Sequence, residues 1–205
     1  MRGVGAWPSG YTGRMATKTR VSLEQFLAMP ETEPPSELVD GEVIQKMSPN
    51  LYHARLTSRL IILVGNYVIE SGEGTILNEL RHVDREERRV FLPDINVTLN
   101  GRLPKGPEAG QHGAIAVQPD FAIEVLSPGE STGRTLERAD FYMRAGTRLL
   151  WLVDPEIEAI TAYRPGQAPT VHRAPAVIDA QPVLRDFTLD VAKLFAVLTE
   201  DDDEE

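Results

Sequence analysis

The stretch QPDFAIEVLSP, residues 118–128, contains two carboxylates inside a run that is otherwise typical of a protein interior. Side chains of a β-strand alternate between its faces, so the larger apolar residues of this run point one way. Asp120 and Glu124 then point the other way. A buried carboxylate is costly unless it is paired, protonated or bound to a cation. The run therefore predicts a strand with one core face and one charged face, on which Glu124 needs a partner or a chemical role.

Segments with helical and strand patterns alternate on both sides of this run, without an internal repeat. Apolar spacing, caps and stop residues predict helices over residues 22–29, 51–72 and 131–146, and a strand followed by a closing helix within 183–198. Strands are predicted in residues 36–49 as a hairpin around Asp40 and Gly41, and in 74–80, 88–99, 118–128 and 148–166. Such an order predicts an α/β domain with a mixed central sheet flanked by helices.

The chain length favours one domain, because 205 residues with 41% hydrophobic content suit a single substantial core. Residues 1–20 have no periodicity and are predicted to be a disordered leader, with Met15 as an alternative start. The acidic run at 199–205 is predicted to be a disordered tail, since like charges repel each other. The folded domain is therefore expected to span residues 21–198.

Composition also restricts the class of protein. The chain has no cysteine, which excludes disulfides and thiol catalysis and fits a reducing compartment. It has neither a signal-peptide pattern nor an apolar stretch of membrane-spanning length, so we expect a soluble, cytoplasmic protein without a membrane partner. The acidic residues at 200–205 supply −6 of the net charge of −10, which leaves −4 for the rest. This mildly acidic body lacks the basic footprint that is usual in nucleic-acid-binding proteins.

A second Pro-Asp step suggests how a metal could bind. Asp120 and Glu124 lie about 13 Å apart along a straight strand, too far to hold one small cation together. A neighbouring strand is only about 4.8 Å away, so Asp94, in the sequence LPDINVTL, could lie beside Glu124 within reach of a divalent ion. The alternative is that Asp94 and Asp120 merely mark strand ends, where Pro-Asp is common.

The order of these motifs resembles the PD-(D/E)XK nuclease superfamily, and within it the Uma-type family of restriction endonucleases. The resemblance extends over about residues 21–195. It rests on ELVDGE at 37–42, a histidine near the start of a long helix, two PD steps, EVLSP at 124–128, and YMRAGTRLLWLVDP at 142–155. It implies a restriction-endonuclease-like fold and a Mg²⁺-dependent (or Mn²⁺-dependent) endonuclease that hydrolyses DNA phosphodiester bonds. A homodimer is expected with it, because two sites are needed to cut both strands of a duplex.

The same resemblance implies roles for particular residues. The metal-binding carboxylates fall on Asp94 and Glu124, with Asp120 as a frequent companion. Where the family has a lysine, four residues before Tyr142, this chain has Arg138. Arginine can stabilise the charge on a phosphate, but it cannot take a proton from water, because its pKa stays above about 12.

Two alternatives to an active nuclease therefore stay open. The first is a catalytically impaired nuclease fold that acts as a DNA-binding or interaction module, in keeping with the missing lysine and the acidic body. The second is a binding domain without any nucleic-acid role, in which a salt bridge to Arg138 neutralises Glu124.

Four further residues are candidates. Lys46, one of only four lysines, could enter the site, or it could be a solvent-facing residue of its strand. His53 could contact a phosphate or a metal, or it could be a surface or capping residue. Glu37 could supply an outer carboxylate; Asp40 could too, although its turn with Gly41 explains it equally well.

Overall fold

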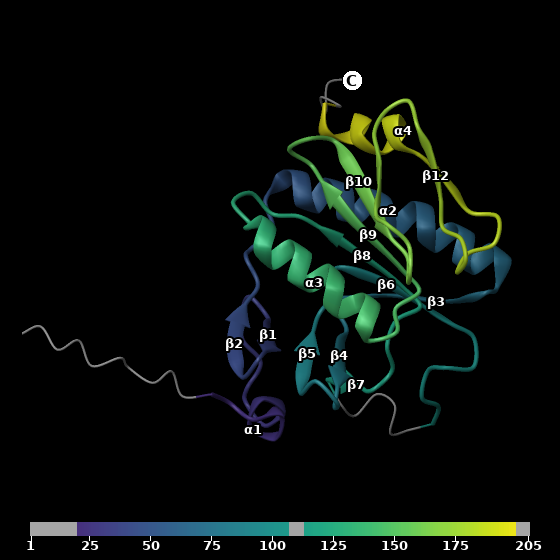
Figure 1. Ribbon diagram of the computed structural model, residues 1–205. Coiled ribbons are helices and arrows are strands. Elements are labelled where there is room, and N and C mark those ends of the chain that lie inside the picture. Colours follow the sequence, from purple (N-terminus) through teal and green to yellow (C-terminus); the bar gives the residue numbers. More distant parts are fainter. Residues whose placement is uncertain (1–19, 107–112, 200–205) are drawn as a thin grey trace, which may run out of the picture.

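The computed structural model of the chain describes residues 20–106 and 113–199 (Figure 1). Apart from residues 20 and 199, the predicted leader and the predicted acidic tail lie outside the described residues. The domain is mixed α/β, as predicted, with helices packed against a central sheet.

A six-stranded sheet forms the centre of the molecule, with the strand order β11-β10-β9-β8-β6-β3. Its strands are β3 (Gly74–Asn78), β6 (Ile95–Leu99), β8 (Phe121–Val125), β9 (Leu149–Asp154), β10 (Ala159–Tyr163) and β11 (Thr170–His172). The strand β8 comes from the predicted run at 118–128, and it pairs antiparallel with β6 and parallel with β9. It therefore lies in the interior of the sheet.

Helices cover both faces of this sheet (Figure 1). The long helix α2 (Leu51–Ser71) begins at its N-cap Asn50 and ends at Gly72, whose φ of +65° is left-handed. On one face, α2 and the short helix α4 (Val191–Phe195) pack on a core that includes Phe121, Ile123 and Val125. The opposite face carries α3 (Thr132–Arg144), which is capped by Ser131.

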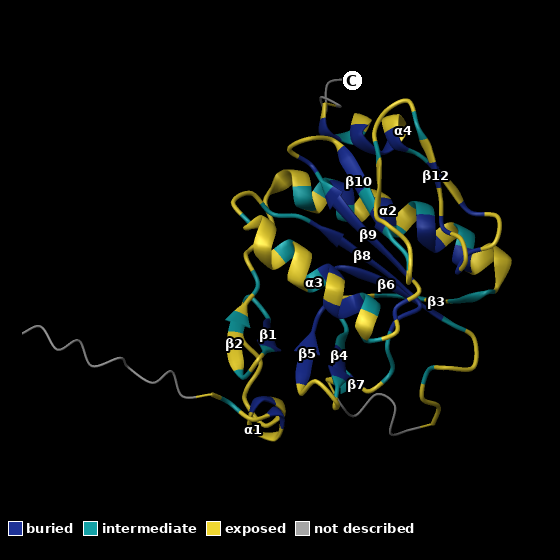
Figure 2. Cartoon of the chain, viewed as in Figure 1, coloured by how far each residue is buried: buried dark blue, intermediate teal, exposed yellow. Residues whose placement is uncertain are grey.

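Both faces of β8 are buried, so the prediction of one core face and one charged face is only half right. Figure 2 shows the inner strands as fully buried, with exposed residues on the outer faces of the helices. Ala122 belongs to a second, smaller core under α3, and Glu124 is buried on the same face of β8. The strand thus holds the carboxylate of Glu124 inside the protein, so the partners of this carboxylate determine whether its charge is compensated.

A second, five-stranded sheet lies below the first in Figure 1, with the order β2-β1-β5-β4-β7. Its strands are β1 (Ser36–Val39), β2 (Glu42–Gln45), β4 (Arg81–Asp84), β5 (Arg89–Phe91) and β7 (Ala114–Ile115). The hairpin β1–β2 has the predicted turn, with positive φ at Asp40 and Gly41. The helix α1 (Leu23–Leu27), with a capping box from Ser22 to Gln25, precedes it.

The single strand predicted over residues 88–99 is wrong. The chain leaves the five-stranded sheet after β5 and enters the six-stranded sheet at β6. Pro93 has no N–H for a sheet ladder, and the N–H of Leu92 donates to the Glu37 carboxylate at 2.7 Å. A side chain thus replaces the strand partner there, and the segment 92–94 joins the two sheets.

The remaining elements close the C-terminal end. They are β12 (Val177–Asp179), β13 (Thr188–Asp190) and a 3-10 helix, η2 (Ala196–Leu198).

None of the helices in residues 20–106 and 113–199 has the length and apolar character that crossing a bilayer requires.

Candidate active site

Asp94 lies where the chain passes from one sheet to the other, directly before β6. Because Ile95 pairs with Ile123 in the antiparallel ladder, Asp94 stands opposite Glu124 in register. The N–H of Val125 donates to Asp94 Oδ2 at 2.8 Å. Burial opposes ionisation of Asp94, yet the hydrogen bond from His53 and the charge of Lys46 hold the pKa of this carboxyl well below its usual range. Asp94 is therefore a fixed negative charge.

Glu124 is buried in the interior strand, with only 3% of its side chain exposed. Its Oε1 accepts a hydrogen bond of 2.6 Å from the hydroxyl of Tyr142, and its Oε2 lies 3.9 Å from Nη1 of Arg138. Burial raises the pKa of Glu124 to about 7, against the lowering effect of Arg138 and Lys46. The neighbouring cations thus compensate this carboxylate incompletely, and a further cation beside it would be favourable.

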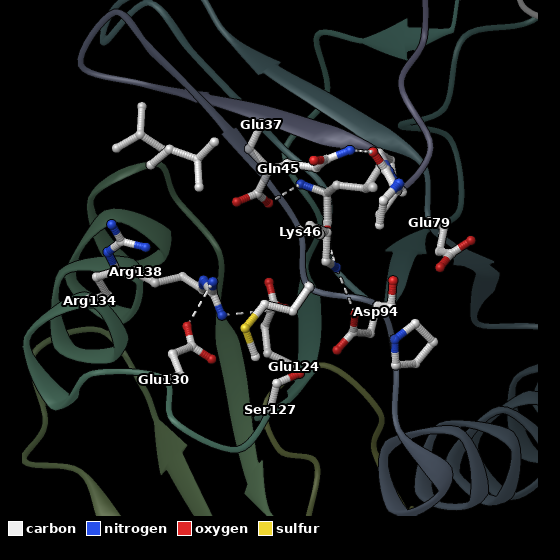
Figure 3. Close-up of a pocket in the computed structure, with 18 of the residues that line it drawn as sticks. Glu37, Gln45, Lys46, Glu79, Asp94, Glu124, Ser127, Glu130, Arg134 and Arg138 are labelled. Carbon is white, nitrogen blue, oxygen red and sulfur yellow. Dashed lines mark hydrogen bonds and ion pairs between the residues drawn. The ribbon is translucent and has the colours of Figure 1, made fainter.

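Lys46 reaches this pair of carboxylates from the other sheet. It directly follows β2, and its Nζ donates to Asp94 Oδ1 and to the carbonyl of Leu92, both at 2.7 Å (Figure 3). Only 19% of its side chain is exposed. The alternative of a solvent-facing lysine is therefore wrong. Despite burial, the nearby charges of Glu124 and Asp94 raise the pKa of Lys46, so it stays an ammonium ion.

Arg138 lies on α3, at the predicted distance of one turn from Tyr142. Its Nη2 is 2.9 Å from Glu130, closer than the 3.9 Å that separates Nη1 from Glu124. Figure 3 shows the guanidinium between these two glutamates. The salt bridge to Glu124 exists, but the raised pKa of Glu124 means that Arg138 does not neutralise it completely.

The other candidates separate into two groups. His53 lies in the first turn of α2, where its Nε2 is 3.2 Å from Asp94 Oδ2. Glu37 lines the same cleft and accepts the hydrogen bond from Leu92. Asp40, by contrast, belongs to the β1–β2 turn. Asp120 lies at the opposite end of β8 and accepts from the N–H of Leu99 at 2.9 Å.

Asp120 has its own cationic partner, Arg102, at 2.6 Å from its Oδ1. It is therefore a structural carboxylate that fixes the residues after β6, and the structure separates it from Asp94 and Glu124 as the strand geometry predicts.

A cleft of about 810 Å³ lies over the two carboxylates. One wall is the β1–β2 hairpin with the residues after it, and the other is the start of α3 (Figure 3). Among the lining residues that the sequence did not assign to the metal site are Glu130 and Arg134. Arg134 could have been found, because it precedes Arg138 by four residues and shares its face of the helix. Glu130 lies before the helix cap, where no periodicity applies.

The donor set suits a hard divalent cation. Within the part of the chain that the structure describes, no three His, Asp or Glu side chains are grouped closely enough to form a metal cage. Mg²⁺ is usually bound by one or two carboxylates, with water and phosphate oxygens as its other ligands. Asp94 and Glu124 match that pattern, and the incompletely compensated charge of Glu124 favours it. Asp94 Oδ1 would have to share or exchange its contact with Lys46.

Comparisons with known proteins point to one family. The model of the Uma2 family, described as "putative restriction endonuclease", matches residues 23–192. A crystal structure of a "putative nuclease" of the DUF820 family from Anabaena variabilis is similar, with a TM-score of 0.80 and 29% sequence identity. The similarity covers 87% of this chain and 99% of that one. Among curated proteins, none matches this chain.

Proposed function

The chain belongs to the Uma2 family of putative restriction endonucleases, and from this premise we propose that it is a Mg²⁺-dependent endonuclease that hydrolyses DNA phosphodiester bonds. The observation that supports this most strongly is the pairing of Asp94 and Glu124 across adjacent strands at the base of the cleft. Glu124 is buried there with too little positive charge around it. Such a carboxylate is expected at a functional site rather than in a purely structural core.

In this proposal Asp94 and Glu124 hold Mg²⁺ or Mn²⁺. The ion supplies Lewis-acid polarisation of the phosphate and acidifies a bound water. Tyr142 and the N–H of Val125 fix the two carboxylates through hydrogen bonds of 2.6 and 2.8 Å, so little reorganisation is needed. In the reaction, the oxygen of water bonds to phosphorus while the bond from phosphorus to a sugar oxygen breaks. The proton lost by the water balances the one gained by the leaving oxygen.

Arg138 has a supporting role in the same proposal. Its planar guanidinium can donate to two phosphate oxygens, which stabilises the negative charge of the phosphate. It is already near Glu124 and paired with Glu130, so it enters the site from the α3 wall.

A second candidate function is a nuclease fold that binds DNA without turnover. The tight pairing of Arg138 with Glu130 favours it, since an engaged guanidinium has fewer donors left for a phosphate. The two functions differ in one measurable respect, because only the endonuclease gives metal-dependent cleavage that requires Asp94.

The test combines metal binding with cleavage. Mg²⁺ and Mn²⁺ are titrated calorimetrically into the wild type and into Asp94→Asn and Glu124→Gln, and plasmid nicking is followed with and without a chelator. We expect both substitutions to abolish metal binding and cleavage, while Glu156→Gln, an exposed turn residue, leaves both unchanged. Metal binding without Asp94-dependent cleavage would select the DNA-binding module. The absence of both from the wild type would refute the metal site.

A further inference from the structure

We propose that Lys46 is the residue that contacts the scissile phosphate, so that the cationic group of the site comes from the β1–β2 hairpin of the second sheet. This role rests on the proposed nuclease function. Lys46 Nζ lies 2.7 Å from Asp94 Oδ1, and its charge also acts on Glu124. No other lysine occurs among the residues that line the cleft.

The hydrogen bonds of Lys46 leave it one donor for a ligand. An ammonium group has three N–H donors and no acceptor. Among the described residues, the partners of Nζ are the carbonyl of Leu92 and Asp94 Oδ1. The third N–H is therefore available beside the two carboxylates, and 19% of the side chain is still open to the cleft.

The side chain is also held in place at both of its ends. The backbone N–H of Lys46 donates to the carbonyl of Pro35 at 2.9 Å, which fixes the chain just beyond β2. At the other end, the contact with Leu92 fixes the ammonium. A charged group that is ordered before substrate binds loses little conformational freedom on binding, which is what a phosphate contact requires.

The charges of the cleft distinguish Lys46 from the arginines around it. Arg81 pairs with Glu31 at 3.2 Å, Arg89 lies 3.6 Å from Glu137, and Arg138 pairs with Glu130. The nearest carboxylate of each of these arginines lies outside the proposed metal site, although Arg138 is also 3.9 Å from Glu124.

Lys46 is different, because its nearest carboxylate, at 2.7 Å, is that of Asp94, a proposed metal ligand. Once Asp94 has a divalent ion as its counter-charge, Lys46 is no longer needed to neutralise it. The ammonium can then turn its charge to a phosphate oxygen without leaving Asp94 uncompensated.

The experiment separates a phosphate contact from a purely structural role. Lys46→Gln keeps a hydrogen-bond donor near Leu92 but has no charge, and Lys46→Arg keeps the charge. Lys193→Gln is the matched control, because Lys193 is 81% exposed and lies on α4. For each protein, Ca²⁺ binding is measured by calorimetry, and binding of a short fluorescein-labelled DNA duplex in Ca²⁺ is measured over a range of NaCl concentrations.

We expect Lys46→Gln to weaken duplex binding by about tenfold, the loss of one charge-assisted hydrogen bond. The slope of log affinity against log salt should fall by about 1, since one phosphate contact is lost. Ca²⁺ affinity should stay equal or increase, because a competing cation has left Asp94. Mg²⁺-dependent cleavage should fall by about 100-fold or more. Lys46→Arg should restore the salt slope, and Lys193→Gln should behave as the wild type.

Three outcomes would overturn this role, and each has a different meaning. If the wild type cleaves DNA and Lys46→Gln matches it within about twofold in cleavage and in salt slope, the phosphate contact is refuted while the nuclease function stands. Weaker Ca²⁺ binding with an unchanged salt slope would likewise assign Lys46 to the support of Asp94 alone. If the wild type neither binds metal nor cleaves, the proposed function fails, and this role fails with it.

Discussion

The hydroxyl of Tyr142 is fully buried and stabilises the ionised form of Glu124 through a hydrogen bond. Tyr142→Phe removes this hydroxyl and leaves the ring in its place between Phe91 and Phe141. We expect the free energy of unfolding to fall by about 1–3 kcal/mol, since a buried acceptor loses its donor. Urea unfolding near neutral pH measures the change. Tyr163→Phe, at a partly exposed position on β10, should change stability far less, and equal losses in both variants would contradict the assignment.

A second residue, His82, should make stability depend on pH. Burial lowers the pKa of His82, against the opposing effect of its hydrogen bond to Val117, and its Nδ1 lies 2.6 Å from the Val117 carbonyl. The folded protein therefore resists protonation, whereas the unfolded chain takes up a proton as pH falls through about 6.5. The contribution of His82 to stability is constant above that pH and declines below it.

The raised pKa of Glu124 acts in the opposite direction over the same range, so the test is a comparison of variants. Between about pH 7.5 and pH 5 we expect the free energy of unfolding of the wild type to fall relative to that of His82→Gln. Denaturant titrations at both pH values measure it. The partly exposed His172 on β11 supplies the control, His172→Gln. If the free energy of unfolding of His82→Gln changes with pH as that of the wild type does, His82 does not contribute to the pH dependence.

At the scale of the elements, two glycines of helices should respond in opposite directions to alanine. Gly72 ends α2 with a φ of +65°, a backbone conformation that is strained for any residue with a Cβ. A Cβ added at this position would have no atom within 4 Å, so the strain would come from the backbone alone. Gly72→Ala should lower stability by about 1 kcal/mol. Gly133 lies inside α3 with equally open space, so Gly133→Ala should raise stability by about 0.5–1 kcal/mol. Thermal unfolding measures the change in stability of each variant relative to the wild type. Two changes in the same direction would refute the argument from φ.

The elements that the sequence predicted well are those with local signals. The strand in 118–128, the helix capped by Ser131 and the Asp40–Gly41 turn all depend on neighbouring residues, and the structure has each of them. The split of 88–99 between two sheets depends instead on Glu37, which is 55 residues away from Leu92. A long-range side-chain contact of this kind leaves no periodic pattern in the sequence.

The same distinction applies to the site. Asp94 and Glu124 could be placed together from strand spacing alone, because adjacent strands fix their distance. The contact of Lys46 with Asp94 could not be predicted in this way, because the two residues adjoin strands of different sheets. The resemblance to a family directed attention to Arg138, yet the ammonium of Lys46 lies nearer to its carboxylate than the guanidinium of Arg138 lies to Glu124.

For the whole molecule we predict a homodimer with two-fold symmetry. Each chain has one proposed site, and cleavage of both strands of a duplex requires two sites in opposite orientations. Sedimentation velocity at micromolar concentration should show a dimer, and wild-type protein should linearise a supercoiled plasmid in step with nicking it. A monomer that only nicks would contradict the dimer and leave the single-strand reaction intact.

The parallel pairing of β8 with β9 determines when a growing chain can acquire its site. Translation delivers residues in order from the N-terminus, so Lys46, Asp94 and Glu124 leave the ribosome before β9 at Leu149–Asp154 and before Tyr142 on α3. Until then β8 lacks a neighbour on one edge, and Glu124 lacks the hydroxyl that fixes it. A nascent chain therefore lacks the assembled form of the proposed site until α3 and β9 have been synthesised.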